Sequence, residues 1–236
     1  MAINGKNIPW AQLGFESVLI VVSILLAFGI ERWWSDRQDS IEEQTLLRQL
    51  KVEFEDNASR LAKKRLDHEE VRSAGLRLLS VTGPEATVDE LGIDAIQADL
   101  GTLMSLLTYD PGTGALSVVI QSKLDLISSD DLRTSLSAWP ANYQDLAEDE
   151  QWVIKVTLER VVPYLVESTT IQDFSTTLTG IREGRFPADL EIMLRDRKFA
   201  NILTAKIGRI ASTLNEYDET KLLFNETLAL IQSQIH

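Results

Sequence analysis

Residues 67 to 70 read Asp-His-Glu-Glu and offer the side-chain types that bind metal ions. A protein metal site needs several such ligands on one helix face, at spacings of three or four, or from neighbouring helices. His68 has no second histidine near it in the sequence, and the adjacent Arg65 and Arg72 are typical of a solvated helix surface. We therefore expect no metal site and no cofactor.

Three other stretches contain groups used in catalysis or binding, and each has a simpler structural interpretation. Gly-Thr-Gly at 112–114 lacks the lysine and the preceding strand of a phosphate-binding loop, so it predicts a turn whose Thr113 caps a helix. The acids of 128–131 suit a helix amino terminus, and those of 148–151 predict a hydrated helix face. No serine is marked as a nucleophile. We expect no catalytic residues and a protein that is not an enzyme.

Composition and charge narrow the function further. The chain has 236 residues, no cysteine and a formal net charge of −13. Without cysteine it has no disulfides, no thiol catalysis and no thiolate metal sites. A surface this acidic would be repelled by a phosphate backbone, which argues against nucleic acid as a partner.

One charged residue, Glu16, interrupts the apolar stretch from Ile8 to Ile30. About 20 apolar residues suffice to cross a bilayer as a helix. The stretch ends in charged residues and two tryptophans rather than in the small residues of a signal-peptide cleavage site, which favours a permanent anchor in the lipid bilayer. Trp10 at one end, and Trp33 and Trp34 at the other, are expected at the two membrane interfaces.

Glu16 has three interpretations at this level. It can reach the headgroups near the start of the helix, contact a neighbouring copy or a partner helix, or carry protons or ions in a channel. Small and polar residues drive helix association in lipid. The residues expected to line such contacts are Glu16, Gly14, Ser17, Ser23, Ala27 and Gly29.

The charges that flank the span point in two directions. Arg32 and Arg37 outnumber Lys6, which favours a cytoplasmic carboxyl side, but the short amino-terminal tail is cationic and has no acid, which favours the reverse. We expect the second arrangement: a single-pass protein of the bacterial inner membrane with its large domain in the periplasm.

The rest of the chain reads as helices. Residues 35–80 contain no proline and one glycine, with apolar residues spaced by three or four, which predicts a helix that continues the span as one rod or with a small kink. Thr87 and Glu90 match a capping box at the start of a second helix. The acids of 128–131 predict a short helix that ends near Pro140, followed by a long helix over 142–168.

The carboxyl-terminal segment has the sharpest pattern, a heptad seam with alternating spacings of four and three. It predicts a long helix that buries a narrow stripe, either in a coiled coil between chains or inside a bundle. Lys221 is the one charged member, and we expect its stem to pack while its head reaches water. The seam consists of Leu203, Ile207, Ile210, Leu214, Tyr217, Lys221, Phe224, Leu228, Ile231 and Ile235.

Together these patterns predict an all-α protein, in which one amino-terminal transmembrane helix continues into a bundle of long antiparallel helices that ends in the heptad helix. We divide the chain into a short tail over 1–8, a transmembrane helix over 9–34 and an extramembrane helical bundle domain over 35–236.

Two stretches resemble a family of single-span bacterial membrane proteins of uncharacterised activity. The first is GFESVLIVVSILLAFGIERWWSDRQ, residues 14–38, in which Phe15 separates Gly14 from Glu16 where many members have Gly-Glu directly. The second is the segment 109–150, with its turn, TGAL and LDLISSDDLR. The resemblance implies one span and a helical extramembrane domain, and it implies a role for Glu16 beyond contact with headgroup water. It supplies no catalytic residues.

The sequence therefore favours a membrane-anchored helical scaffold or accessory protein that acts through homo-oligomerisation or through association with a larger membrane complex. Two alternatives stay open. The domain can be a periplasmic sensor or binding module that passes a signal through the helix, or the chain can be an ion-coupled membrane subunit that uses Glu16.

Overall fold

The computed structural model describes residues 10–174, 186 and 189–236, with the side chains of 10–14 and 17 excepted. The predicted tail over 1–8 lies outside this part. All regular structure among the described residues is helical, without a strand, so the predicted all-α fold is confirmed.

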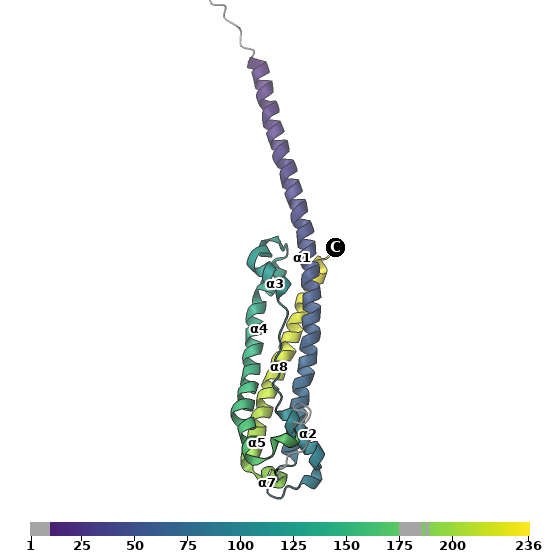
Figure 1. The fold of residues 1–236 in the computed structure, drawn as a ribbon. Coiled ribbons are helices and arrows are strands. Elements are labelled where there is room, and N and C mark those ends of the chain that lie inside the picture. Colours follow the sequence, from purple (N-terminus) through teal and green to yellow (C-terminus); the bar gives the residue numbers. More distant parts are fainter. Residues whose placement is uncertain (1–9, 175–185, 187–188) are drawn as a thin grey trace, which may run out of the picture.

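A single helix, α1, runs from Trp10 to Ser80 over 71 residues (Figure 1). It joins the apolar segment to the bundle without a break, as the absence of proline predicts. Its inner face from Leu46 onward is buried, whereas the part before it extends away from the rest of the chain. The helix ends at a turn around Gly83, where Val81 and Thr82 donate backbone hydrogen bonds to the carbonyls of Leu78 and Leu79.

Short elements connect α1 to the next long helix. The turn η1 (Val88–Glu90) and helix α2 (Ile93–Leu103) lie at the end of the bundle farthest from the apolar segment. The predicted capping box is wrong, because the Thr87 side chain makes no capping hydrogen bond. Gly92 separates η1 from α2, and its positive φ of 89° is a backbone conformation that glycine adopts readily.

An extended segment, 105–113, then runs back along the bundle toward the apolar segment (Figure 1). It leads into α3 (Gly114–Val118), the π-helical turn η2 (Val119–Lys123) and η3 (Leu124–Leu126). Tyr109 in this segment is buried and has ring contacts with Tyr143 of α4 and Tyr217 of α8.

Helix α4 (Asp130–Val156) continues through the π-helical turn η4 (Thr157–Val161) into α5 (Val162–Ser168). Its start is as predicted, since the Ser129 hydroxyl accepts a hydrogen bond from the backbone N–H of Leu132. The predicted end near Pro140 is wrong. The neighbouring Trp139 ring packs on Phe54 of α1 and Phe224 of α8, with centroids 5.2 and 4.3 Å away, and this burial offsets the lost helix hydrogen bond.

The chain returns through η5 (Ile171–Asp173), α7 (Leu190–Arg195) and α8 (Arg197–Gln234). Helix α8 is antiparallel to α1 and packs against both α1 and α4. Near its end, Gln44 of α1 donates to the Gln234 carbonyl at 2.8 Å. The bundle therefore consists of three long helices with α8 in contact with both others.

The buried face of α8 differs from the predicted seam. Leu203, Ile210, Tyr217, Phe224 and Ile231 are buried as that seam requires, and so is Leu214. The rest of the seam is less covered: Ile207, Leu228 and Ile235 are half-buried, and Lys221 is exposed. The second fully buried column lies one position earlier in each heptad and consists of Phe199, Lys206, Thr213, Thr220 and Thr227.

Threonines fit this column because their hydroxyl groups find acceptors nearby. Thr213 donates to the Arg209 carbonyl at 3.1 Å, and Thr227 to the Leu223 carbonyl at 2.8 Å. Thr227 also accepts a hydrogen bond from the Trp139 indole at 3.1 Å. The seam thus packs inside this chain's own bundle, which is one of the two arrangements that the heptad pattern allowed.

Candidate functional site

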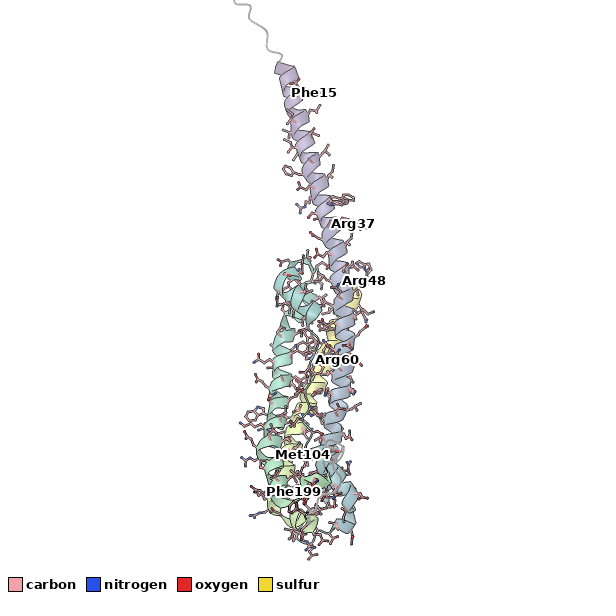
Figure 2. The ribbon with its side chains drawn as sticks, in the orientation of Figure 1. Phe15, Arg37, Arg48, Arg60, Met104 and Phe199 are labelled. Carbon is pink, nitrogen blue, oxygen red and sulfur yellow. The ribbon has the colours of Figure 1, made fainter. Side chains whose placement is uncertain are left out.

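The first candidate site is the apolar part of α1, which extends beyond the bundle (Figure 2). From Val18 onward this helix is long and apolar enough to span a membrane, with a mean hydropathy of 1.7 over its best window, and none of that window is buried in the described structure. Phe15 and Arg37 lie on this free stretch, whereas Arg60 lies beside the bundle. Trp33 and Trp34 are exposed, with ring centroids 6.5 Å apart. The Trp10 side chain lies outside the described residues.

The expected contact residues of the span fall on more than one face. Successive helix residues turn by about 100°, so Glu16, Ser23 and Ala27 lie on one side of α1 and Gly29 lies on another. Ser23 donates its hydroxyl hydrogen to the Leu19 carbonyl at 2.8 Å, so this group is satisfied within its own helix. The side chain of Ser17 and the surroundings of Gly14 lie outside the described part.

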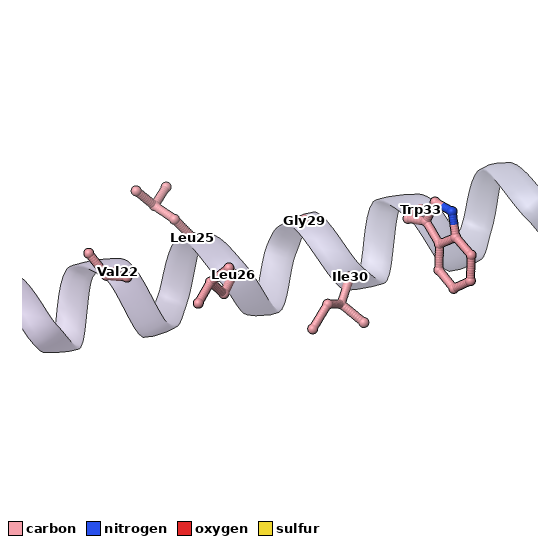
Figure 3. A pocket seen from close by; sticks show the side chains of 6 residues that line it. All are labelled: Val22, Leu25, Leu26, Gly29, Ile30 and Trp33. Atoms are coloured by element: carbon pink, nitrogen blue, oxygen red, sulfur yellow. The ribbon is translucent and has the colours of Figure 1, made fainter.

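Gly29 forms a notch in the apolar surface (Figure 3). A Cβ at this position would meet no atom within 4 Å. The notch has a volume of about 390 Å³ and is lined by Val22, Leu25, Leu26, Gly29, Ile30 and Trp33. A missing side chain on an exposed apolar helix gives another helix room to approach closely.

The second candidate is a buried polar cluster in the bundle, which we call the Glu150 cluster: Asn57, His68, Tyr109, Glu150 and Tyr217. The expectation of a solvated surface for His68 and of a hydrated face at 148–151 is wrong for His68 and Glu150, whose side chains are 1% and 2% exposed. Both face the centre of the bundle, where α1, α4 and α8 meet the extended segment 105–113.

Glu150 accepts hydrogen bonds from the backbone of that extended segment. Its two carboxylate oxygens accept the Tyr109 N–H at 3.0 and 3.1 Å, and one of them also accepts the Tyr217 hydroxyl. Burial, with the hydrogen bond to Glu150, raises the pKa of Tyr217 above its usual range, so the phenol remains a donor. An extended backbone inside a helical bundle cannot satisfy its own N–H groups, and Glu150 supplies one acceptor.

Asn57 does the same for the next part of the segment. Its amide donates to the Gly112 carbonyl at 2.7 Å and accepts the Gly112 N–H at 2.8 Å. The Tyr109 hydroxyl in turn donates to the Asn57 carbonyl at 3.1 Å. Asn57 therefore binds the segment to α1 through both sides of its amide.

His68 is the incomplete member of the cluster. Its Nε2 lies 3.7 Å from a Glu150 oxygen, which is too far for a hydrogen bond. This nitrogen is buried and has no hydrogen-bond partner among the described residues, while the ring lies 5.3 Å from the Tyr217 ring. The cluster is closed to solvent, so its observed chemistry is structural: it holds the extended segment in the bundle.

The predicted cap of α3 by Thr113 is wrong, because the Thr113 side chain makes no capping hydrogen bond. Instead, the Glu53 carboxylate accepts the N–H groups of Ala115 and Leu116 at 2.6 and 3.0 Å. A carboxylate suits the amino terminus of α3 because these N–H groups have no partner within the helix.

A second buried charge, Lys206, lies toward the far end of the bundle. Its ammonium donates to the Leu103 carbonyl at the end of α2 and to the Thr157 hydroxyl of η4, the latter at 2.8 Å. Burial lowers the pKa of Lys206 to about 7. A lysine that is fully buried beside a π-helical turn is a candidate for function. Its observed contacts are structural: it satisfies the carbonyl at the end of α2 and a threonine hydroxyl within the α4–η4–α5 helix.

Sequence reasoning missed Asn57, Tyr109, Glu150 and Lys206. For Lys206 a signal existed, since it continues the heptad spacing between Leu203 and Ile210. For the others the burial depends on a segment far away in the sequence. Among the described residues no group of three His, Cys, Asp or Glu could hold a metal ion. No protein-family model, curated protein or solved structure matches the chain.

Proposed function

We propose that this chain is a membrane-anchored helical accessory protein, without enzymatic activity, that assembles with copies of itself or with a larger membrane complex through its apolar span. One observation carries the proposal. The apolar side chains of α1 before the bundle are exposed and have no cover within the described chain, although apolar surface of this extent needs lipid or protein around it.

The bundle offers less for assembly than the heptad pattern led us to expect. The buried column of α8 packs against α1 and α4 of the same chain. We therefore keep the proposed contact on the span, where small residues and Glu16 are available. We also propose that the amino terminus is cytoplasmic and the bundle periplasmic, in the bacterial inner membrane, from the cationic tail that precedes the span.

The absence of cysteine allows a direct test. Single-cysteine variants Ala27→Cys and Leu25→Cys place a thiol on nearly opposite faces of the span, since two residues turn a helix by about 200°. The control, Leu222→Cys, places a thiol on the exposed side of α8, where Leu222 is 62% exposed. Each variant is oxidised in native membranes and analysed by non-reducing electrophoresis.

We expect disulfide-linked dimers, or links to a partner that carries its own cysteine, from one span face and not from the control. Native mass spectrometry of the gently solubilised wild type then gives the copy number or the partner's mass. A one-chain mass together with equal, weak cross-linking at all three positions would rule the proposal out.

A further inference from the structure

A groove lies on the outside of the bundle between η4–α5 and the first half of α8. Figure 1 shows α5 at the end of the bundle far from the apolar segment. We call it the distal groove. Its volume of about 820 Å³ is in the range of sites that take small organic ligands. It is lined along both helices by apolar residues, including Val156, Ile202 and Ala205, and by charged residues. An apolar floor beneath charged groups suits an amphiphilic molecule.

Three arginines on this groove have no carboxylate partner among the described residues: Arg160, Arg197 and Arg209. The chain otherwise has acids in excess, and several arginines use them. Arg65 binds Asp218 at 2.7 Å, and Arg77 binds Asp99 at 2.6 Å. Unpaired guanidinium groups around one groove of an acidic protein are free to bind an anion.

The carboxylates of the groove are unevenly placed. At the end near Arg197, Asp196 caps α8 by accepting the Lys198 N–H at 2.7 Å and accepts the Tyr164 hydroxyl at 2.8 Å. Glu167 lies 4.0 Å from the Lys198 ammonium. These acids offset the positive charge at that end. Glu159 is the remaining carboxylate on the lining.

The opposite end of the groove is bounded by Arg209, whose guanidinium lies 5.2 Å from the centre of the Trp152 ring. Lys155, whose ammonium lies 5.0 Å from the same ring, adds positive charge beside the groove without lining it. A guanidinium that has no carboxylate partner among the described residues is free to bind an anion at this end. Val156 and Ala205 are apolar residues that line the same groove as Arg209.

We propose that the distal groove binds a small organic anion, a phosphate or carboxylate on an apolar body. Arg209 and Arg160 bind the anionic group, and the apolar body lies over Val156, Ile202 and Ala205. The site would give the accessory protein a ligand-binding function that is separate from assembly through the span.

The test uses the full chain in nanodiscs of neutral phosphatidylcholine, so that lipid headgroups add no net negative charge. Phenyl phosphate and benzoate are titrated as the two probes, with inorganic phosphate as the anion that lacks an apolar body. Binding is followed by calorimetry and by tryptophan fluorescence, since Trp152 lies under Arg209. The phenyl phosphate and benzoate arms distinguish a phosphate from a carboxylate ligand.

We expect saturable binding of one aromatic probe, weaker binding of inorganic phosphate, and a loss of affinity of about tenfold or more in Arg209→Gln and in Arg160→Gln. Lys221→Gln is the matched control, because it removes one exposed positive charge from the same helix and should bind as wild type does. Ala205→Trp fills the apolar floor without a change in charge and should also abolish binding. Glu159→Gln removes a like charge and should tighten it.

All these positions except Arg160 and Glu159 lie on α8, so the melting curve by circular dichroism is checked for each variant. No saturable binding by either aromatic probe, or an equal loss in Lys221→Gln and Arg209→Gln, would overturn the proposal. Neither result depends on the copy number, so the assembly proposal succeeds or fails separately.

Discussion

Two of the places in which the bundle buries ionisable side chains, the Glu150 cluster and Lys206, differ in what surrounds them. In the Glu150 cluster, a carboxylate meets a backbone N–H, a tyrosine hydroxyl and a nearby histidine ring. At Lys206, an ammonium meets one backbone carbonyl and one threonine hydroxyl, and none of the described acids is paired with it. The Glu150 carboxylate accepts hydrogen bonds from the donors around it. Burial disfavours the charged form of Lys206, and this lowers its pKa.

The comparison shows that side chains on the long helices hold the connecting segments in place. Each of these two buried charges satisfies a backbone group that no helix hydrogen bond reaches: the Tyr109 N–H in the extended segment for Glu150, and the Leu103 carbonyl at the end of α2 for Lys206. Glu53 does this for α3. The positions of these charges are therefore determined by the connecting segments rather than by the helix that carries them.

The largest expected effect is at Glu150. In Glu150→Leu, the buried Tyr109 N–H and Tyr217 hydroxyl both lose their acceptor, and we expect the free energy of unfolding to fall by about 3–5 kcal/mol. Urea denaturation followed by circular dichroism measures this. The control Glu148→Leu changes an exposed carboxylate on the same helix and should stay within about 0.5 kcal/mol of wild type. Equal losses in both variants would remove the special role of Glu150.

At Lys206 the expected effect depends on pH. Between about pH 7 and the ordinary lysine pKa, the unfolded chain holds a proton that the folded chain has released. The free energy of unfolding therefore rises with pH in this window. Below pH 7 Lys206 is protonated in both states, so it adds no pH dependence there. Relative to Lys206→Met, the wild type should gain about 1.4 kcal/mol per pH unit from pH 7 to 9. Parallel stability curves for the two proteins would show that Lys206 has a normal pKa in the fold.

His68 should show the smallest effect and sharpen the description of the cluster. Within the described part of the chain its Nε2 has no hydrogen-bond partner, so His68→Phe keeps a ring against Tyr217 and should change stability by less than about 1 kcal/mol. Tyr217→Phe removes a hydrogen bond to a charged group and should cost more, about 1.5–3 kcal/mol. If His68→Phe costs as much as Tyr217→Phe in the same denaturation assay, then His68 is bound to Glu150 in solution.

The sequence was informative where structure depends on local chemistry. The absence of proline predicted the continuity of α1, and Ser129 with its following acids predicted the start of α4. It failed where distant residues decide. Pro140 does not end a helix because Trp139 is buried between α1 and α8, and the acids of 148–151 are not all hydrated because the segment around Tyr109 covers Glu150. The polar column of α8 was overlooked because an apolar column beside it has the same period.

The continuity of α1 also fixes the rotation of the bundle relative to the apolar segment about the axis of α1. From Glu31 to Ala74 the helix contains neither glycine nor proline, so no joint separates the face of the span from the face that carries Asn57 and His68. One residue inserted near Gln38 would rotate the whole bundle by about 100° and lift it by about 1.5 Å relative to the span. Seven inserted residues would restore the original facing to within about 20°. In the proposed assembly, the side of the span that contacts a neighbour therefore sets the orientation that the bundle presents to its surroundings.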